Sequence, residues 1–154
     1  MHQKGIVTLA AAMLVLFLLT SGYEAELFFL RFYQAAIYLV IILLFFYFED
    51  RWAYMFGMMV PIFGILLNFA SGSLWAQARA VGRLLGRGAP PNPALLLGAL
   101  ATICGVALAI LSYRVFKREI IGTRYARPTF WGTLVMVVIY YGVLVYWFAK
   151  EAAG

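Results

Sequence analysis

Five long apolar runs fill most of this chain, and no acidic residue or lysine lies in the middle of any of them. They cover residues 5–22, 27–48, 53–71, 94–113 and 129–149. Each run is long enough to cross a hydrocarbon core of about 30 Å as a helix. In lipid, only helices and closed barrels satisfy their own backbone hydrogen bonds. The sequence therefore predicts an all-α integral membrane bundle of five transmembrane helices, with residues 1–154 forming a single transmembrane domain.

The composition supports a membrane protein and argues against a soluble one. Hydrophobic residues make up 66% of the chain and charged residues 12%, which is far from the usual mix of a soluble domain. The net charge is +6. Basic residues at membrane edges set orientation and contact anionic lipid, so nucleic acid is not an expected partner.

Residues 73–87 form a shorter segment of a different kind. On a helical wheel, one face carries three arginines at intervals of four residues: Arg79, Arg83 and Arg87. An apolar set falls almost opposite: Leu74, Ala78, Val81 and Leu85. This pattern predicts a short interfacial amphipathic helix between the third and fourth spans, with its arginines in contact with anionic lipid headgroups. The alternative is a binding surface for a phosphate-bearing ligand or for a partner's acidic tail.

The distribution of basic residues predicts an orientation in the membrane. With five spans, one side carries seven of them: Lys4, Arg51, Arg114, Lys117, Arg118, Arg124 and Arg127. The other side carries five: Arg31, Arg79, Arg83, Arg87 and Lys150. Since cytoplasmic loops are enriched in Lys and Arg, we expect a cytoplasmic N-terminus, with the loop 114–127 in the cytoplasm. The expected location is a prokaryotic cytoplasmic (inner) membrane.

Small residues mark one face of the third span and one face of the fourth. On the third they are Gly57, Pro61 and Gly64, and on the fourth they are Gly98, Ala101 and Gly105. Small side chains let helix backbones approach closely, which drives association inside lipid. We therefore expect these two spans to pack against each other. Pro61 should also bend its helix, because it removes one backbone hydrogen bond.

Polar side chains of three spans form the candidate binding site. The set comprises Arg31, Gln34, Tyr38, Asn68, Ser71, Tyr141 and Tyr146. Antiparallel connectivity brings all of them toward the same membrane face, where polar groups are costly unless they meet one another, water or a ligand. They are expected to converge on a half-buried polar pocket anchored by Arg31. For Arg31 itself, extension to the headgroups is the favoured arrangement, and a pair with Glu24 or Glu26 is the alternative.

Two connections carry helix-capping signals. Ser21 and Glu24 match a capping box, with Ser21 as the N-cap of the second helix. Asn92 and Pro93 read as the N-cap and first residue of the fourth long helix.

Reactive groups are scarce along the spans, which excludes several classes of function. The only histidine is His2, and Cys104 has no histidine or cysteine near it in the spans. All six acidic residues lie at or beyond span ends: Glu24, Glu26, Glu49, Asp50, Glu119 and Glu151. Ion-coupled transporters place carboxylates inside the membrane, and enzymes need catalytic sets that this chain does not offer. We therefore expect no metal, no cofactor and no enzymatic activity.

The remaining classes of function differ in their expected partners. The favoured role is a non-catalytic subunit or assembly factor of a larger membrane complex, whose partners are membrane lipids and other membrane proteins or further copies of this chain. The alternative is a small oligomeric transporter or channel for a neutral or lipidic solute. A lipid-modifying membrane enzyme is a third hypothesis.

Overall fold

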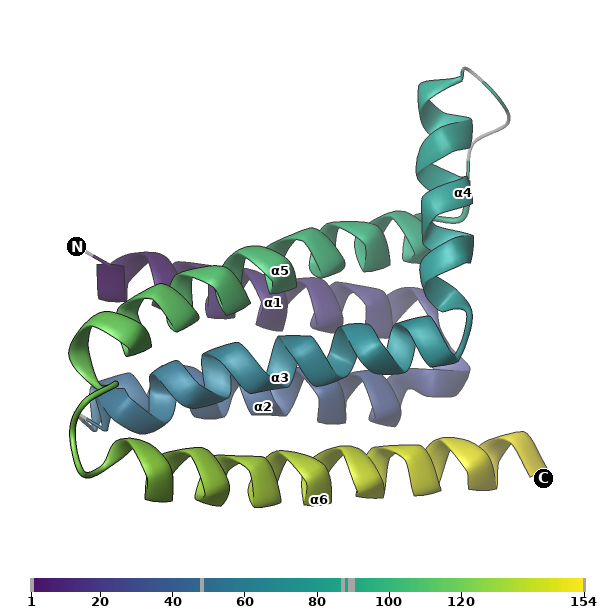
Figure 1. The fold of residues 1–154 in the computed structure, drawn as a ribbon. Coiled ribbons are helices and arrows are strands. Elements are labelled where there is room, and N and C mark those ends of the chain that lie inside the picture. The colour runs from purple at the N-terminus through teal and green to yellow at the C-terminus, as the bar shows by residue number, and fades with distance from the viewer. Residues whose placement is uncertain (1, 48, 87, 89–90, 154) are drawn as a thin grey trace.

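The protein is a bundle of long helices with one short helix set across its end (Figure 1). The computed structural model describes residues 2–47, 49–86, 88 and 91–153. In these residues it contains no β-strand. The helices are α1 (His2–Tyr23), η1 (Ala25–Leu27, a 3-10 turn), α2 (Phe28–Phe46), α3 (Asp50–Ala70), α4 (Ser73–Leu85), α5 (Pro93–Glu119) and α6 (Ala126–Ala153). Five of them, all but η1 and α4, are long and apolar enough to cross a membrane, which confirms the predicted all-helical class.

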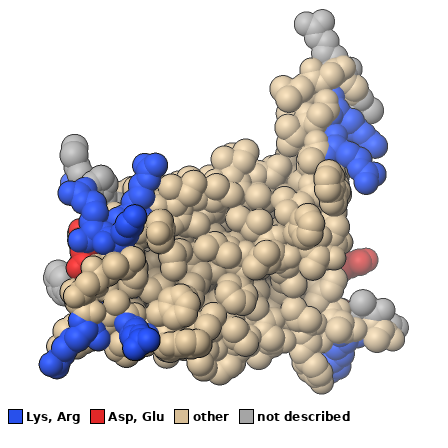
Figure 2. All heavy atoms as spheres, viewed as in Figure 1, with Lys and Arg blue, Asp and Glu red and all other residues tan. Residues whose placement is uncertain are grey.

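The five long helices run side by side and alternate in direction, so the two termini lie at opposite ends of the bundle (Figure 1). On the face shown in Figure 2, charged side chains gather at these two ends, and an uncharged belt separates them. α4 stands across the end that also holds the α1–α2 connection (Figure 1). This arrangement of charge is what a helical bundle that crosses a bilayer requires.

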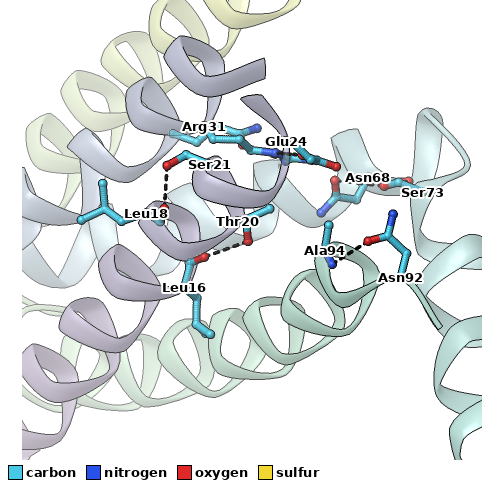
Figure 3. A network of polar contacts seen from close by, with 11 residues as sticks. Leu16, Leu18, Thr20, Ser21, Glu24, Arg31, Asn68, Ser73, Asn92 and Ala94 are labelled. Atoms are coloured by element: carbon cyan, nitrogen blue, oxygen red, sulfur yellow. Dashed lines mark hydrogen bonds and ion pairs between the residues drawn. The ribbon is translucent and has the colours of Figure 1, made fainter. Parts of the chain in front are cut away.

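Two of the helix ends test the capping signals. The backbone N–H of Ala94 donates to Asn92 Oδ1 over 3.0 Å, and Pro93 is the first residue of α5, as predicted. The capping box at Ser21 is wrong, because α1 continues to Tyr23. The hydroxyl of Ser21 donates to the carbonyl of Leu18 within α1 over 2.6 Å (Figure 3).

α5 extends well beyond the apolar run that predicted it. The run ends at residue 113, whereas the helix continues to Glu119 through Lys117 and Arg118. These basic residues are good helix formers, and they sit in the last turn, where the helix dipole favours positive charge. Hydropathy therefore marks the part of this helix suited to lipid and misses the turns that follow it.

α3 has the largest buried share of the five long helices and α6 the smallest. Tyr54, Met55 and Val60 of α3 are fully buried in the core. α6 packs against α3 and α2, and the hydroxyls of two tyrosines form hydrogen bonds to these helices. The hydroxyl of Tyr140 donates to the carbonyl of Tyr33 over 2.6 Å, and that of Tyr141 donates to the carbonyl of Val60 over 2.7 Å.

The small residues of α3 and α5 lie at contacts with several helices and not only at the expected contact between α3 and α5. A Cβ added to Gly57 would lie 2.5 Å from Ser112 Oγ, and one added to Gly105 would lie 3.4 Å from the Cβ of Pro61, so α3 and α5 do approach closely. The two other glycines belong to other contacts. Gly64 faces the hydroxyl of Tyr141 on α6, and Gly98 faces Gln77 on α4.

Candidate binding cavity

A cavity of about 190 Å³ lies inside the bundle, toward the end crossed by α4. Its described lining residues come from α1, α2, α3, α4 and α5 and from Glu24 in the α1–α2 connection. The polar part of the lining comprises Thr20, Glu24, Arg31, Tyr38, Asn68, Ser73, Gln77 and Thr102. The remaining lining is mostly apolar and reaches Pro61 and Gly105, which lie about halfway along α3 and α5. The cavity therefore runs from a polar end under α4 to an apolar end near the middle of the bundle.

Arg31 pairs with Glu24 at the connection between α1 and α2. Arg31 Nε lies 2.7 Å from Glu24 Oε2, and Arg31 Nη1 donates to Gln34 Oε1 over 3.0 Å. The side chains of Arg31 and Glu24 are only 25% and 29% exposed. Figure 3 shows the pair where α1 gives way to α2, beside Asn68 and Ser73. The alternative of a pair with Glu24 is thus observed, whereas extension of Arg31 to the headgroups stays a prediction.

This ion pair fixes the electrostatic character of the cavity. Among the described residues of the lining, Arg31 and Glu24 are the only charged ones, and their charges cancel. The other polar groups are amides and hydroxyls. An ionised ligand would lose its hydration without meeting a net opposite charge, which is unfavourable in a poorly solvated site. The lining is suited to uncharged ligands.

The α3–α4 turn places Gln77 over the cavity. Gly72 has φ 74°, a left-handed conformation that glycine adopts without strain, and α4 begins at the next residue. Ser73 Oγ lies 3.1 Å from Asn68 Oδ1 across the turn. One helical turn further on, Gln77 Oε1 accepts from Thr102 Oγ1 over 3.0 Å, which links α4 to α5. Gln77 is buried against Gly98, where only a glycine leaves room for it.

A second cavity of about 30 Å³ adjoins the first on the side of α6. It adds Gln34 and Tyr141, and it shares Arg31, Tyr38 and Asn68 with the larger cavity. Its volume is about that of one water molecule in the liquid. These five residues of the candidate site are thus brought together around two adjoining cavities.

Two residues of the candidate site lie elsewhere. Ser71 is exposed at the end of α3, and its hydroxyl donates to the carbonyl of Asn68. Tyr146 is 72% exposed on α6. It lies five residues after Tyr141, which on a helix is about 140° away from it, so the two cannot both face the core. Their inclusion in the pocket was wrong.

Sequence reasoning missed several residues of the lining, among them Thr20, Gln77 and Thr102. Gln77 had a detectable signal, because it is an uncharged amide between the arginine face and the apolar face of its segment. Thr20 and Thr102 carried none, since a threonine in a membrane helix can bond its own backbone. Thr20 does so here, to the carbonyl of Leu16, and Thr102 Oγ1 lies 3.0 Å from the carbonyl of Gly98, an acceptor that competes with Gln77 Oε1 for its one hydrogen.

The arrangement offers hydrogen bonding and shape more than reactivity. In the described part of the chain, no group of three or more His, Cys, Asp or Glu side chains could hold a metal ion. On α4, Arg79 and Arg83 are exposed, and Arg87 lies outside the described residues. No protein-family model, no curated protein and no solved structure matches this chain.

Proposed function

We propose that this protein binds a small uncharged solute within the membrane and, as an oligomer, acts as a transporter or channel for it. The observation that carries the proposal is the cavity, which is electrically balanced and leads from one end of the bundle toward its middle. A protein with a purely structural role has no need of such a space, because empty volume in a helix bundle reduces stability.

The inner end of the cavity supports a role in passage as well as in binding. Pro61 lies there, and a proline inside a helix removes the hydrogen bond that the carbonyl of Gly57 would accept. A helix bends most easily where this bond is missing. Bending of α3 at Pro61 would extend the path toward the other end of the bundle.

α4 is proposed to lie in the membrane interface. It crosses the bundle end, and the basic side chains that it carries project away from the bundle (Figures 1 and 2). In this position Arg79 and Arg83 would meet anionic headgroups, while the apolar side of α4 would face the acyl chains. Substituting both arginines with glutamine should reduce the amount of anionic lipid that co-purifies with the protein in mild detergent and leave the amount of zwitterionic lipid unchanged.

The test of solute passage compares two variants of the same helix. Purified protein in liposomes should pass glycerol or urea faster than protein-free liposomes do, as measured by light scattering after an osmotic step. Ala101 is buried and lines the cavity, so Ala101→Leu should reduce this rate to the protein-free level. Ala107 is exposed on α5, so Ala107→Leu should leave the rate unchanged. Equal rates with and without protein for both solutes would refute the proposal.

A role as a non-catalytic subunit or assembly factor remains the second proposal. It is supported by α6, whose outward side exposes large apolar residues including Trp131, Ile139 and Tyr146. Purification in mild detergent separates the two functions, because stoichiometric recovery of other membrane proteins is expected only of a subunit.

The proposed location is a prokaryotic inner membrane with the N-terminus in the cytoplasm. Single cysteines placed in the loop 114–127, in a Cys104→Ser background, should be shielded from a membrane-impermeant thiol reagent in intact cells. Labelling of that loop from outside would reverse the orientation.

A further inference from the structure

We propose that the cavity selects a small neutral amphiphile, and that its hydrogen-bond acceptor, such as a carbonyl oxygen, binds the side-chain amide of Gln77. This inference rests on the proposed use of the cavity as a binding site and names the chemistry of its ligand.

The first observation concerns Gln77 itself. Its residue surface is only 9% exposed, and its Oε1 accepts from Thr102. No hydrogen bond from its Nε2 to the described residues is present, and this atom is not among the fully buried unpartnered ones, so it keeps some accessible surface at the cavity wall. An amide N–H that faces a poorly solvated cavity gains a hydrogen bond when a ligand brings an acceptor, so this group favours such a ligand. Arg31 reinforces this preference at the same end of the cavity, because a guanidinium can only donate.

The second observation is the change in lining along the cavity. Away from Gln77 the walls are formed by Met13, Pro61 and Gly105, which offer no side-chain hydrogen bonds. Ordered water needs two to four polar partners, so it suits the end near Gln77 and not the end near Pro61. A molecule with one polar end and an apolar body matches both the polar end of the cavity near Gln77 and the apolar end near Pro61.

The volume sets the size of this ligand. An apolar protein cavity of about 150 Å³ holds benzene. The 190 Å³ available here therefore fits a six-membered ring with one short polar substituent. The balanced pair of Arg31 and Glu24 disfavours a carboxylate or an ammonium on that ring.

Four fluorinated probes of nearly equal size test the selectivity. They are 4-fluoroacetophenone, 4-fluorotoluene, 4-fluorobenzoate and 4-fluorobenzylamine. Binding to the purified protein is measured by fluorine NMR, with the signal of protein-free micelles subtracted. The ketone should bind most tightly. Benzoate or benzylamine binding as tightly as the ketone would overturn the proposal.

Variants then test the role of Gln77. Gln77→Leu should weaken ketone binding by roughly three- to tenfold, the loss of one hydrogen bond, and leave fluorotoluene binding unchanged. Gly98→Ala is a milder variant should Gln77→Leu fail to fold, because its Cβ would lie 2.8 Å from Gln77 Nε2 and displace the amide. Gly142→Ala is its matched control, since a Cβ there meets nothing within 4 Å. Unchanged ketone affinity in the folded Gln77 or Gly98 variant would overturn the proposal.

The two proposals fail in distinguishable ways. Ketone binding that depends on Gln77, in a protein that passes no solute in liposomes, leaves the ligand class standing and refutes transport. Solute passage that depends on Ala101, in a protein whose ketone affinity is unchanged by Gln77→Leu, leaves transport standing and refutes the ligand class.

Discussion

The closest approach between α3 and α5 predicts that Gly57→Ala destabilises the bundle. A Cβ at residue 57 would lie 2.5 Å from Ser112 Oγ and 3.4 Å from Ser112 Cβ. Carbon atoms pack best at about 3.5–4.0 Å, so the hydroxyl contact is the one that cannot be accommodated. Ser112 is fully buried, which leaves its side chain little freedom to move aside.

The size of the effect follows from two opposing terms. Overpacking a well-filled core costs about 1–3 kcal/mol. Replacing a helical glycine with alanine returns about 0.5–1 kcal/mol of backbone entropy. We therefore expect Gly57→Ala to lower the free energy of unfolding by about 1–2 kcal/mol. Gly142→Ala adds a methyl in open space on α6 and should be neutral or slightly stabilising.

Ser112 provides a second arm for a double-mutant cycle. Its buried hydroxyl has no hydrogen-bond partner among the described residues, so Ser112→Ala should be neutral or stabilise the protein by up to about 1 kcal/mol. It also removes the closest contact of the new methyl group. Gly57→Ala should then cost about 1 kcal/mol less in the Ser112→Ala background.

The assay is unfolding by SDS in mixed micelles, followed by far-UV circular dichroism, for the parent, the two single variants, the double variant and Gly142→Ala. Equal costs of Gly57→Ala in both backgrounds would show that residues 57 and 112 do not limit the helix approach. The packing argument would then be refuted.

Three further changes probe the contacts around the candidate cavity. Tyr141→Phe removes the 2.7 Å hydrogen bond to the carbonyl of Val60 and should cost about 0.5–1.5 kcal/mol in the same unfolding assay. Gly64→Ala brings a Cβ to 3.0 Å from that tyrosine hydroxyl, so it should cost less in the Tyr141→Phe background than in the parent. Arg31→Leu leaves Glu24 unpaired and should cost about 1–2 kcal/mol, between the values for exposed and buried ion pairs, and Glu24→Gln should recover part of this loss. Undiminished stability in Arg31→Leu would show that the pair contributes nothing.

The fold class was predictable because lipid imposes one strong rule on the backbone. Apolar runs of sufficient length must become helices, so counting them was enough. The start of α5 was equally predictable, because an N-cap followed by proline depends only on adjacent residues, here Asn92 and Pro93. The signal at Ser21 failed for a physical reason. A serine hydroxyl can also bond a carbonyl of the preceding turn, and here that option extends α1.

The choice of packing partners was much less predictable. A row of small residues identifies the side of a helix that meets a neighbour, but it does not identify the neighbour. Gly98 and Gly105 share one row, yet Gln77 of α4 lies against the first, and α3 and α1 lie against the second. The polar set shows the same limit. The sequence indicates the depth of Tyr146 in the membrane, but Tyr146 lies on a different side of α6 from Tyr141 and is exposed.

The position of α4 connects the two sites proposed on it. Gln77 and Arg79 are two residues apart, which on a helix places them about 200° from each other. The same turn at Gly72 that sends Gln77 inward to Thr102 therefore sends Arg79 outward from the bundle. Any force that shifts α4, including a change in the charge of the lipid surface, must also shift the amide at the polar end of the cavity. Ligand affinity is thus expected to depend on the anionic lipid content of the membrane, and this dependence should disappear when Arg79 and Arg83 are replaced by glutamine.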